Sequence, residues 1–254
     1  MPDVWDPAQY ERFRRERAQP FYDLLALVEP RPGMRVADLG CGTGDVTLEL
    51  HRSLKARETV GVDNSPAMLE KAPREPGLRF ILGEIEQFAP PERFDLIFSN
   101  AAFHWVPDHP ALFTRLRAAL APGGQLAVQM PMNDDHASHQ TAFELARTHE
   151  FRRLLHGFER RPRLLEPAQY ASWLHHLGFG RQHVRVQVYG HLLESRDQVI
   201  EWVRGTLLTD YQKRLTPADW ERFLERYREL LLPQLSEERP FFYTYPRILM
   251  WATL

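Results

Sequence analysis

A short apolar run that ends in an acid and a glycine-rich turn constrains this chain most. Residues 36–44 read Val-Ala-Asp-Leu-Gly-Cys-Gly-Thr-Gly, so glycine occupies the alternate positions Gly40, Gly42 and Gly44. Glycine accepts a positive φ angle and has no Cβ, so the backbone N–H groups of such a turn can approach a ligand closely. The pattern predicts a buried strand that carries Asp38, followed by a turn that binds a nucleoside-containing ligand.

The spacing of these glycines separates two classes of ligand. A dinucleotide-binding turn reads G-x-G-x-x-G and aims a helix N-terminus at a pyrophosphate. Here Asp45 occupies the position of the last glycine in that pattern, and its carboxylate would repel a phosphate. The pattern instead resembles motif I of the class I S-adenosylmethionine (SAM) dependent methyltransferases, whose cofactor has a sulfonium and no phosphate. The strand-end acid Asp38 suits such a cationic ligand.

A second predicted strand, residues 59–63, also ends in an acid. It follows the glycine turn by about one βα unit, where the carboxylate of Asp63 can accept hydrogen bonds from both ribose hydroxyls. Asp38 and Asp63 could instead cap helices or be solvated at the strand ends. Their register with the glycines favours a cofactor site.

The alternation of strands and helices continues along the chain. Further strands are predicted at 78–82, 94–100 and 125–130, the last after a Pro-Gly-Gly turn. This alternation predicts a parallel, doubly wound sheet that binds ligands at the carboxyl ends of its strands. The resemblance places Glu84, otherwise a solvated loop acid, near the adenine amino group, and it places 101–105 near the methyl group. The cofactor contacts that it implies are Asp38, Gly40, Cys41, Gly42, Gly44, Asp63, Asn64, Met68, Glu84, Ile85, Asn100 and Ala101.

After residue 131 the pattern changes to helices and two long strands. The predicted helices span residues 136–155, 167–177, 195–206 and 216–232, and the strands span 183–193 and 241–254. We predict a single methyltransferase domain, 1–254, of the α/β class, with a doubly wound, Rossmann-like seven-stranded sheet. Its parts would be a SAM-binding core at 21–131, mostly helical cap insertions at 132–240 lying over the strand ends, and a last strand at 241–254 paired antiparallel with 183–193.

The amino-terminal segment carries a helix-start signal. Asp6 is a capping acid, Pro7 fits the first helical position and Gln9 the third, so a helix is expected from there to about Pro20. Its face would present three residues at helical spacing, namely Tyr10, Phe13 and Arg17. This face could simply pack on the core. Alternatively, residues 1–20 form a lid that closes the cofactor site and offers Tyr10 and Arg17 to a substrate.

Composition narrows the classes of partner. The formal net charge of −2 and the lack of a long basic run disfavour nucleic acid. No apolar run approaches about 18 residues and no leader pattern begins the chain, so we expect a cytoplasmic protein without membrane association. Cys41 is the one cysteine, which excludes an internal disulfide and favours a space-filling role over a reactive thiol. The histidines show no metal-ligand spacing, so no metal is expected, and we expect a monomer or weak dimer.

Motifs outside the cofactor turn narrow the resemblance. Residues 99–109 read SNAAFHWVPDH, and 128–131, 202–203 and 245–247 accompany them. Over nearly the whole chain, this set is similar to the trans-aconitate 2-methyltransferase family. In that family a SAM methyl passes to a carboxylate oxygen of a small tricarboxylate, which gives a monomethyl ester and S-adenosyl-L-homocysteine. The substrate contacts implied by the resemblance are Tyr10, Arg17, His104, Trp105, Tyr245 and Arg247.

The expected chemistry needs no catalytic residue. A carboxylate is already deprotonated near neutral pH, and a sulfonium is already a good leaving group. The rate then comes from alignment of the reacting atoms and from removal of water around the carboxylate. His104 becomes a candidate base only for a hydroxyl or amine acceptor. His104 and Trp105 could equally be core or rim residues, and any single arginine could be a solvated surface group.

One stretch departs from the family pattern. Residues 208–210 read Leu-Thr-Asp where the family carries Leu-Arg-Pro, so an arginine is replaced and an acid is added. Losing a cation is unfavourable for a trianionic substrate. The alternatives are therefore another acceptor, such as a carrier-bound acyl carboxylate or a small-metabolite hydroxyl, and a SAM-binding module without turnover. The intact glycines and both acids speak against the module.

Overall fold

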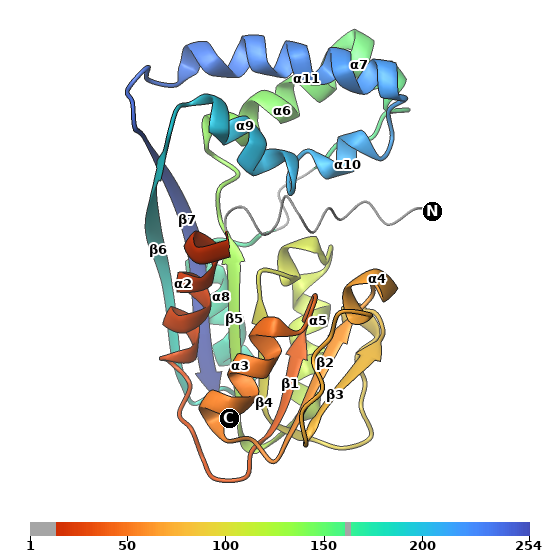
Figure 1. Ribbon diagram of the computed structural model, residues 1–254. Helices are drawn as coiled ribbons and strands as arrows, with labels where there is room; N and C mark the ends of the chain where they lie inside the picture. Colours follow the sequence, from red (N-terminus) through yellow and green to blue (C-terminus); the bar gives the residue numbers. More distant parts are fainter. Residues whose placement is uncertain (1–13, 161–163) are drawn as a thin grey trace. The chain divides into compact units, whose positions relative to one another are not determined.

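The computed structural model describes residues 14–160 and 164–254 and contains a seven-stranded sheet of order β3-β2-β1-β4-β5-β7-β6 (Figure 1). Strands β1 to β5 run parallel to one another, and β7 pairs antiparallel with β5. The sheet confirms the predicted α/β, doubly wound fold. The strands are β1 (Arg35–Leu39), β2 (Glu58–Asp63), β3 (Leu78–Leu82), β4 (Phe94–Asn100), β5 (Leu120–Pro131), β6 (Arg181–Leu193) and β7 (Phe241–Thr253).

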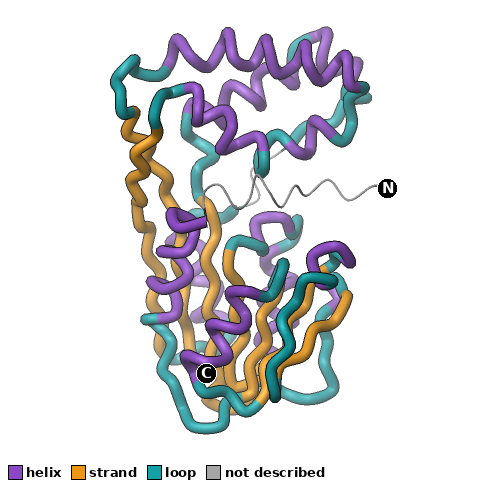
Figure 2. The backbone as a smooth tube through the Cα atoms, in the orientation of Figure 1, coloured by secondary structure: helices purple, strands orange, loops and turns teal. Residues whose placement is uncertain are grey.

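Helices alternate with the parallel strands and dominate the second half of the chain. Figure 2 distinguishes helices, strands and loops by colour along the backbone. Among the described residues, no helix is long and apolar enough to cross a membrane. The helices are α2 (Arg14–Leu25), α3 (Asp45–Leu54), α4 (Pro66–Leu69), α5 (His109–Ala119), α6 (Ala137–Arg147), α7 (His149–Leu154), α8 (Pro167–His176), α9 (Asp197–Arg204), α10 (Thr209–Gln212) and α11 (Pro217–Leu231), with short 3₁₀ turns η1 (Ile85–Gln87), η2 (Phe103–Trp105) and η3 (Leu232–Gln234).

Several features of the structure differ from the prediction. The helix expected at 136–155 is divided at Thr148, whose backbone is extended and whose hydroxyl donates to the carbonyl of Leu145 at 2.8 Å. Such a local hydrogen bond competes with the helical ladder. Strand β5 begins at Leu120 rather than at 125, and the short helix α10 was not predicted. The predicted neighbour of the last strand is correct, but β7 also pairs with β5, which the sequence pattern did not predict.

Apolar layers cover both faces of the sheet. On one face, α5 and α8 pack against strand residues such as Ala37 and Ile97, with Leu116 and Leu174 among the helix residues in this core. The opposite face receives α2. Successive side chains of a strand alternate between the faces, so each parallel strand contributes to both layers.

Helix α2 extends further than its sequence predicts. It continues through Pro20 and ends at Leu25. Phe21 and Leu24 are buried, and the ring centroid of Phe21 lies 5.6 Å from that of Phe98 on β4. The last turns of α2 are therefore ordinary core packing. Tyr10 and Phe13 lie outside the described residues, as does the side chain of Arg17, so a lid formed by 1–20 remains a prediction.

The chain divides into two compact units. The sheet unit comprises residues 17–132, 164–187 and 246–254, and the helical unit comprises 14–16, 133–160 and 188–245, as far as the chain is described. The helical unit has its own apolar core, built around residues of α6, α9 and α11. The predicted cap and this unit overlap without coinciding, because α8 packs with the sheet unit.

The packing of α2 can be tested by a pair of adjacent substitutions. Phe21 is 2% exposed and Tyr22 is 47% exposed. Phe21→Ala should lower the free energy of unfolding by about 3–5 kcal/mol, because it removes a buried ring and leaves a cavity. Tyr22→Ala should cost less than about 1 kcal/mol, as expected for an exposed position. Urea denaturation followed by circular dichroism measures both, and equal costs would contradict the packing of α2 against β4.

Candidate cofactor site

The carboxyl ends of the parallel strands meet at one edge of the sheet. Strands β2 and β3 lie on one side of β1 while β4 and β5 lie on the other, so the order reverses between β1 and β4 (Figure 1). Open α/β sheets bind ligands in the crevice at such a switch point. The glycine turn follows β1 directly and therefore lies at this position.

The glycines of the turn serve two different purposes. All three have a positive φ, namely 80° at Gly40, 54° at Gly42 and 78° at Gly44. A Cβ on Gly40 would lie 2.1 Å from the Cβ of Ala102, and one on Gly44 would lie 2.5 Å from the ring of Phe80. A Cβ on Gly42 would meet no atom within 4 Å. Gly40 and Gly44 are thus required for packing, whereas Gly42 leaves an open side where a ligand can approach.

Asp63 holds both the glycine turn and the start of helix α4 in place. Its Oδ2 accepts from the backbone N–H of Gly42 at 2.8 Å, and its Oδ1 accepts from that of Ser65 at 3.0 Å. Each carboxylate oxygen has a second lone pair, so the group keeps acceptor capacity for ribose hydroxyls. Ser65 in turn caps α4 through the N–H of Met68 at 3.3 Å.

Other predicted cofactor residues lie on neighbouring loops at the same edge. The amide Nδ2 of Asn64 donates to Oε2 of Glu84 at 3.1 Å, which joins the loops after β2 and β3. Ile85 begins η1, and its Cδ1 lies 3.4 Å from the position of a Cβ on Gly40. The structure therefore brings Asn64, Glu84 and Ile85 to the edge that carries the glycine turn.

Asp38 is buried directly beneath the turn. Its side chain is 2% exposed, and its Oδ2 accepts from the hydroxyl of Thr47 on α3 at 2.7 Å. Burial raises the pKa of Asp38 to about 7, the hydrogen bond from Thr47 lowers it, and the nearby charge of Asp63 raises it further. A cation at this edge would favour the ionised form.

Cys41 fits a space-filling role. Its side chain is buried, and burial together with the charges of Asp38 and Asp63 raises the pKa of the thiol well above its ordinary value. A Cβ placed on Gly61 would lie 3.0 Å from the Cys41 sulfur, so the thiol fills the space beside β2. A thiol held in its neutral form is a poor nucleophile.

The end of β4 carries local backbone strain. Ala101 has a φ of 58°, which is uncommon for a residue with a Cβ. Its N–H donates to the carbonyl of Gln129 at 2.9 Å, and the hydroxyl of Ser99 donates to the carbonyl of Leu39 at 2.7 Å. These bonds hold the reversal that brings Ala102 against Gly40. Strain of this kind concentrates at functional sites, which agrees with the predicted position of Ala101 in the cofactor site.

A buried hydrogen-bonded chain anchors the η2 turn, which carries His104 and Trp105. The Nε2 of His109 lies 2.9 Å from the carbonyl oxygen of Phe103, and its Nδ1 is hydrogen-bonded to the hydroxyl of Tyr170. Because a carbonyl only accepts, Nε2 carries the proton and Nδ1 accepts from Tyr170. The rings of His104 and Trp105 are half-buried, with centroids 4.8 Å apart. The hydrogen bond between His109 and Tyr170 carried no signal in the sequence, because the two residues meet only through the packing of α5 on α8.

The two predicted substrate contacts near the carboxyl terminus, Tyr245 and Arg247, belong to different compact units. Tyr245 is buried in the helical unit, where its ring centroid lies 5.7 Å from that of Trp202. Arg247 belongs to the sheet unit and is buried, and its Nη1 donates to Oε1 of Gln129 at 2.9 Å. Direct substrate contacts by Tyr245 and Arg247 remain predictions, as do those by Tyr10 and Arg17.

Asp210, the acid that departs from the family pattern, forms ion pairs with arginines. Asp210 Oδ2 accepts from Nη1 of Arg160 at 2.9 Å, and its other oxygen lies 3.6 Å from Nη1 of Arg214. Both partners belong to the helical unit. The replacement at 208–210 therefore adds no isolated negative charge there.

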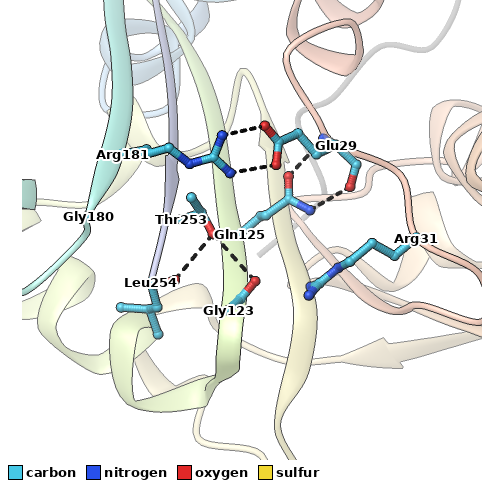
Figure 3. Close-up of a pocket in the computed structure, with 8 residues that line it drawn as sticks. All are labelled: Glu29, Arg31, Gly123, Gln125, Gly180, Arg181, Thr253 and Leu254. Atoms are coloured by element: carbon cyan, nitrogen blue, oxygen red, sulfur yellow. Dashed lines mark hydrogen bonds and ion pairs between the residues drawn. The ribbon is translucent and has the colours of Figure 1, made fainter.

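A separate pocket opens at the opposite edge of the sheet unit (Figure 3). Its volume is about 310 Å³, and a bidentate pair joins Arg181 and Glu29 beside it, at 2.8 and 2.7 Å. No residue of the glycine turn lines it. Within 14–160 and 164–254, no three His, Cys, Asp or Glu side chains are grouped so that they could hold a metal ion.

Comparison with known proteins shows which family this chain belongs to. Residues 10–184 match a methyltransferase domain family. The chain is 42% identical to a trans-aconitate 2-methyltransferase of Deinococcus radiodurans over 98% of each chain, and 39% identical to one of Mycobacterium sp. (strain KMS) over 93% of this chain and 92% of the relative.

Solved structures share the fold. The YcgJ protein from Bacillus subtilis aligns with a TM-score of 0.62 at 19% identity, covering 92% of this chain and 97% of that one. Haemonchus contortus phosphoethanolamine N-methyltransferase 2, solved with S-adenosylhomocysteine, aligns with a TM-score of 0.56 at 16% identity, covering 92% of this chain and 52% of that one.

The sheet order and the glycine turn define a class I methyltransferase, whose cofactor is SAM. The open side of Gly42 and the remaining acceptor capacity of Asp63 fit a nucleoside at this edge. More narrowly, identity over nearly its full length shows that the chain belongs to the trans-aconitate 2-methyltransferase family. Both predicted levels of resemblance are thus confirmed.

Substitution of Gly42 and substitution of Gly40 should have different effects, the first on SAM binding and the second on folding. Gly42→Ala should cost about 1–2 kcal/mol of stability, because a left-handed backbone is strained with a Cβ, and should weaken SAM binding at least tenfold by blocking the open side. Gly40→Ala should prevent stable folding, because its Cβ would overlap that of Ala102. Thermal melts and calorimetric SAM titrations separate the two effects. A Gly42→Ala protein with unchanged SAM affinity would remove Gly42 from the site.

The raised pKa of Asp38 predicts a pH-dependent stability. The pKa is about 7 in the folded protein and about 4 in the unfolded chain, so the unfolded state ionises first as the pH rises. The ligand-free protein should therefore lose a few kcal/mol of stability relative to Asp38→Asn between about pH 4 and pH 7, with no further change above. Urea unfolding of both proteins over this range measures the difference. A constant difference would contradict a protonated, buried Asp38.

Proposed function

We propose that this chain transfers the SAM methyl group to a carboxylate oxygen of trans-aconitate, which yields its monomethyl ester and S-adenosyl-L-homocysteine. The observation that carries the proposal is the 42% identity to the Deinococcus radiodurans relative over 98% of both chains. The cofactor edge, meaning the carboxyl ends of the parallel strands with the glycine turn, is intact as well. The space beside Gly42 is open to a ligand, and Asp63 accepts a hydrogen bond from the turn.

The chemistry asks for positioning rather than for proton transfer. When bound, SAM supplies a methyl group on a sulfonium, which leaves as a neutral thioether while the acceptor oxygen gains the methyl carbon. The residues of the edge hold the reacting groups in line, an effect that can contribute several kcal/mol. Asp63 and the turn at Gly42 fix the nucleoside, and Asp38 contributes a negative charge beneath it once ionised. No residue has to accept a proton, because the acceptor carboxylate is already ionised.

The remaining carboxylates of the acceptor need cations. Arginine is suited to this because its planar guanidinium binds a carboxylate in a bidentate way. We assign this role to Arg17, with Tyr10, Trp105 and Tyr245 as further contacts. For Arg247, the hydrogen bond to Gln129 gives an indirect route to the same edge. His104 has no proton to remove from a carboxylate and acts as a contact.

Methyl transfer from labelled SAM tests the proposal directly. The assay compares trans-aconitate with cis-aconitate, citrate and a panel of small hydroxyl compounds. We expect an alkali-labile methyl ester of trans-aconitate as the main product, and His104→Asn should keep kcat within about threefold because no general base is removed. Asp63→Ala serves as a control that weakens SAM binding by about 1–3 kcal/mol through lost hydrogen bonds.

Two results would contradict the carboxylate acceptor. The first is turnover of hydroxyl compounds alone, with an activity that depends on His104. The second is tight SAM binding without turnover of any acceptor, which would favour a binding module.

A further inference from the structure

A buried polar chain crosses three strands at the cofactor edge. Nη1 of Arg247 on β7 donates to Oε1 of Gln129 on β5 at 2.9 Å, and Nε2 of Gln129 donates to Oδ1 of Asn100 on β4 at 2.6 Å. Gln129 is 1% exposed and Arg247 is 6% exposed. In the sequence, Gln129 belongs to the 128–131 motif.

The strand register places these side chains on one face of the sheet. Asn100 is directly opposite Gln129 in the parallel pair β4 and β5. Gln129 is opposite Leu249 in the antiparallel pair β5 and β7, and Arg247 lies two residues from Leu249. Side chains two residues apart on a strand point to the same face. The chain of hydrogen bonds therefore follows from the sheet itself.

Arg247 fixes the donor-to-acceptor direction of this series of hydrogen bonds. A guanidinium can only donate, so Gln129 has to turn Oε1 toward Arg247 and its NH₂ group toward Asn100. Asn100 must then accept through Oδ1, which leaves its own NH₂ group on the other side of the amide. Reversing either amide would set donors against donors in a buried place.

Asn100 stands beside the glycine turn. It immediately precedes Ala101, whose strained backbone brings Ala102 against Gly40. Asn100 is half-buried, whereas Gln129 is buried. An NH₂ group with fixed polarity at this edge is suited to a negatively charged oxygen of a ligand.

We propose that Gln129 is a positioning residue that carries the donor polarity of Arg247 to Asn100, so that Asn100 Nδ2 donates to a carboxylate bound at the cofactor edge. The carboxylate belongs either to the methionine part of SAM or to the methyl acceptor. The inference rests on the proposed function for the second source. Arg247 thus acts on an anion through two amides.

A nearly isosteric substitution, Gln129→Glu, separates polarity from packing. The introduced carboxylate would still accept from Arg247, now as an ion pair, so the melting temperature should stay within a few degrees. It cannot donate, so Asn100 would turn its NH₂ group toward this carboxylate and present Oδ1 to the ligand. We expect the affinity for the carboxylate ligand to fall 10- to 100-fold. Gln129→Met, which neither donates nor accepts strongly, should give a smaller loss of about three- to tenfold.

Gln125→Glu is the matched control. Gln125 lies on the same strand and is also buried, but its amide bonds the backbone of Glu29 and the indole of Trp251. The same chemical change there should lower stability and leave both ligand affinities within about twofold. A comparable loss of affinity in Gln125→Glu and Gln129→Glu would show a general structural effect and overturn the proposal.

Calorimetry in two arms identifies the source of the carboxylate. One arm titrates SAM into the protein, and the other titrates trans-aconitate into the protein saturated with S-adenosylhomocysteine. A selective loss in Gln129→Glu in either arm supports the proposal and names the ligand. Affinities within twofold of the wild type in both arms overturn it.

Side-chain amide exchange provides a readout that does not depend on turnover. The NH₂ signal of Asn100 in an ¹⁵N NMR spectrum is identified by its loss in Asn100→Asp. In Gln129→Glu its exchange with water should slow at least tenfold, because the NH₂ group becomes bonded to the introduced carboxylate. Unchanged exchange overturns the relay. A wild-type protein that binds SAM and fails to methylate trans-aconitate would instead refute the proposed function, and the exchange and SAM arms would still decide on Gln129.

Discussion

The close approach of the β1 turn to the end of β4 is the constraint on which the cofactor edge depends. Gly40 lies so near Ala102 that no Cβ fits between them, and the hydroxyl of Ser99 ties β4 to the carbonyl of Leu39. The strained backbone of Ala101 follows from the same approach. Because the edge is built by backbone contacts between neighbouring parallel strands, its geometry is set by the sheet rather than by flexible loops.

Burial of charge is the second consequence of that arrangement. Asp38 is held out of water under the turn, where burial raises its pKa to about 7. A buried carboxyl costs stability in the ligand-free protein at neutral pH and becomes favourable when a cation lies beside it. Asp38 therefore lowers the stability of the ligand-free protein and favours binding of a cationic ligand. Cys41 shares this environment, where burial, together with the charges of Asp38 and Asp63, raises the pKa of its thiol.

The sequence predicted what depends on local pattern and missed what depends on tertiary packing. The strands, the glycine turn and the strand-end acids Asp38 and Asp63 have short-range signatures, and their order along the chain fixes the doubly wound sheet. The pairing of β7 with β5 could not be predicted, because it joins residues more than a hundred positions apart. The same holds for His109 with Tyr170, and for the continuation of α2 through Pro20, where burial of Phe21 outweighs the missing backbone donor.

The antiparallel β7 also explains how a buried cation can act at this edge through other side chains. Because β7 runs against β5, Arg247 lies at the carboxyl ends of the parallel strands, although it is near the end of the chain. A buried guanidinium loses its hydration and needs a partner that only accepts from it. Gln129 fulfils this need with Oε1 and passes the polarity on to Asn100. A hydrogen-bonded chain that begins at a group unable to accept has one direction, so the sheet itself determines that a donor, and not an acceptor, faces the bound anion.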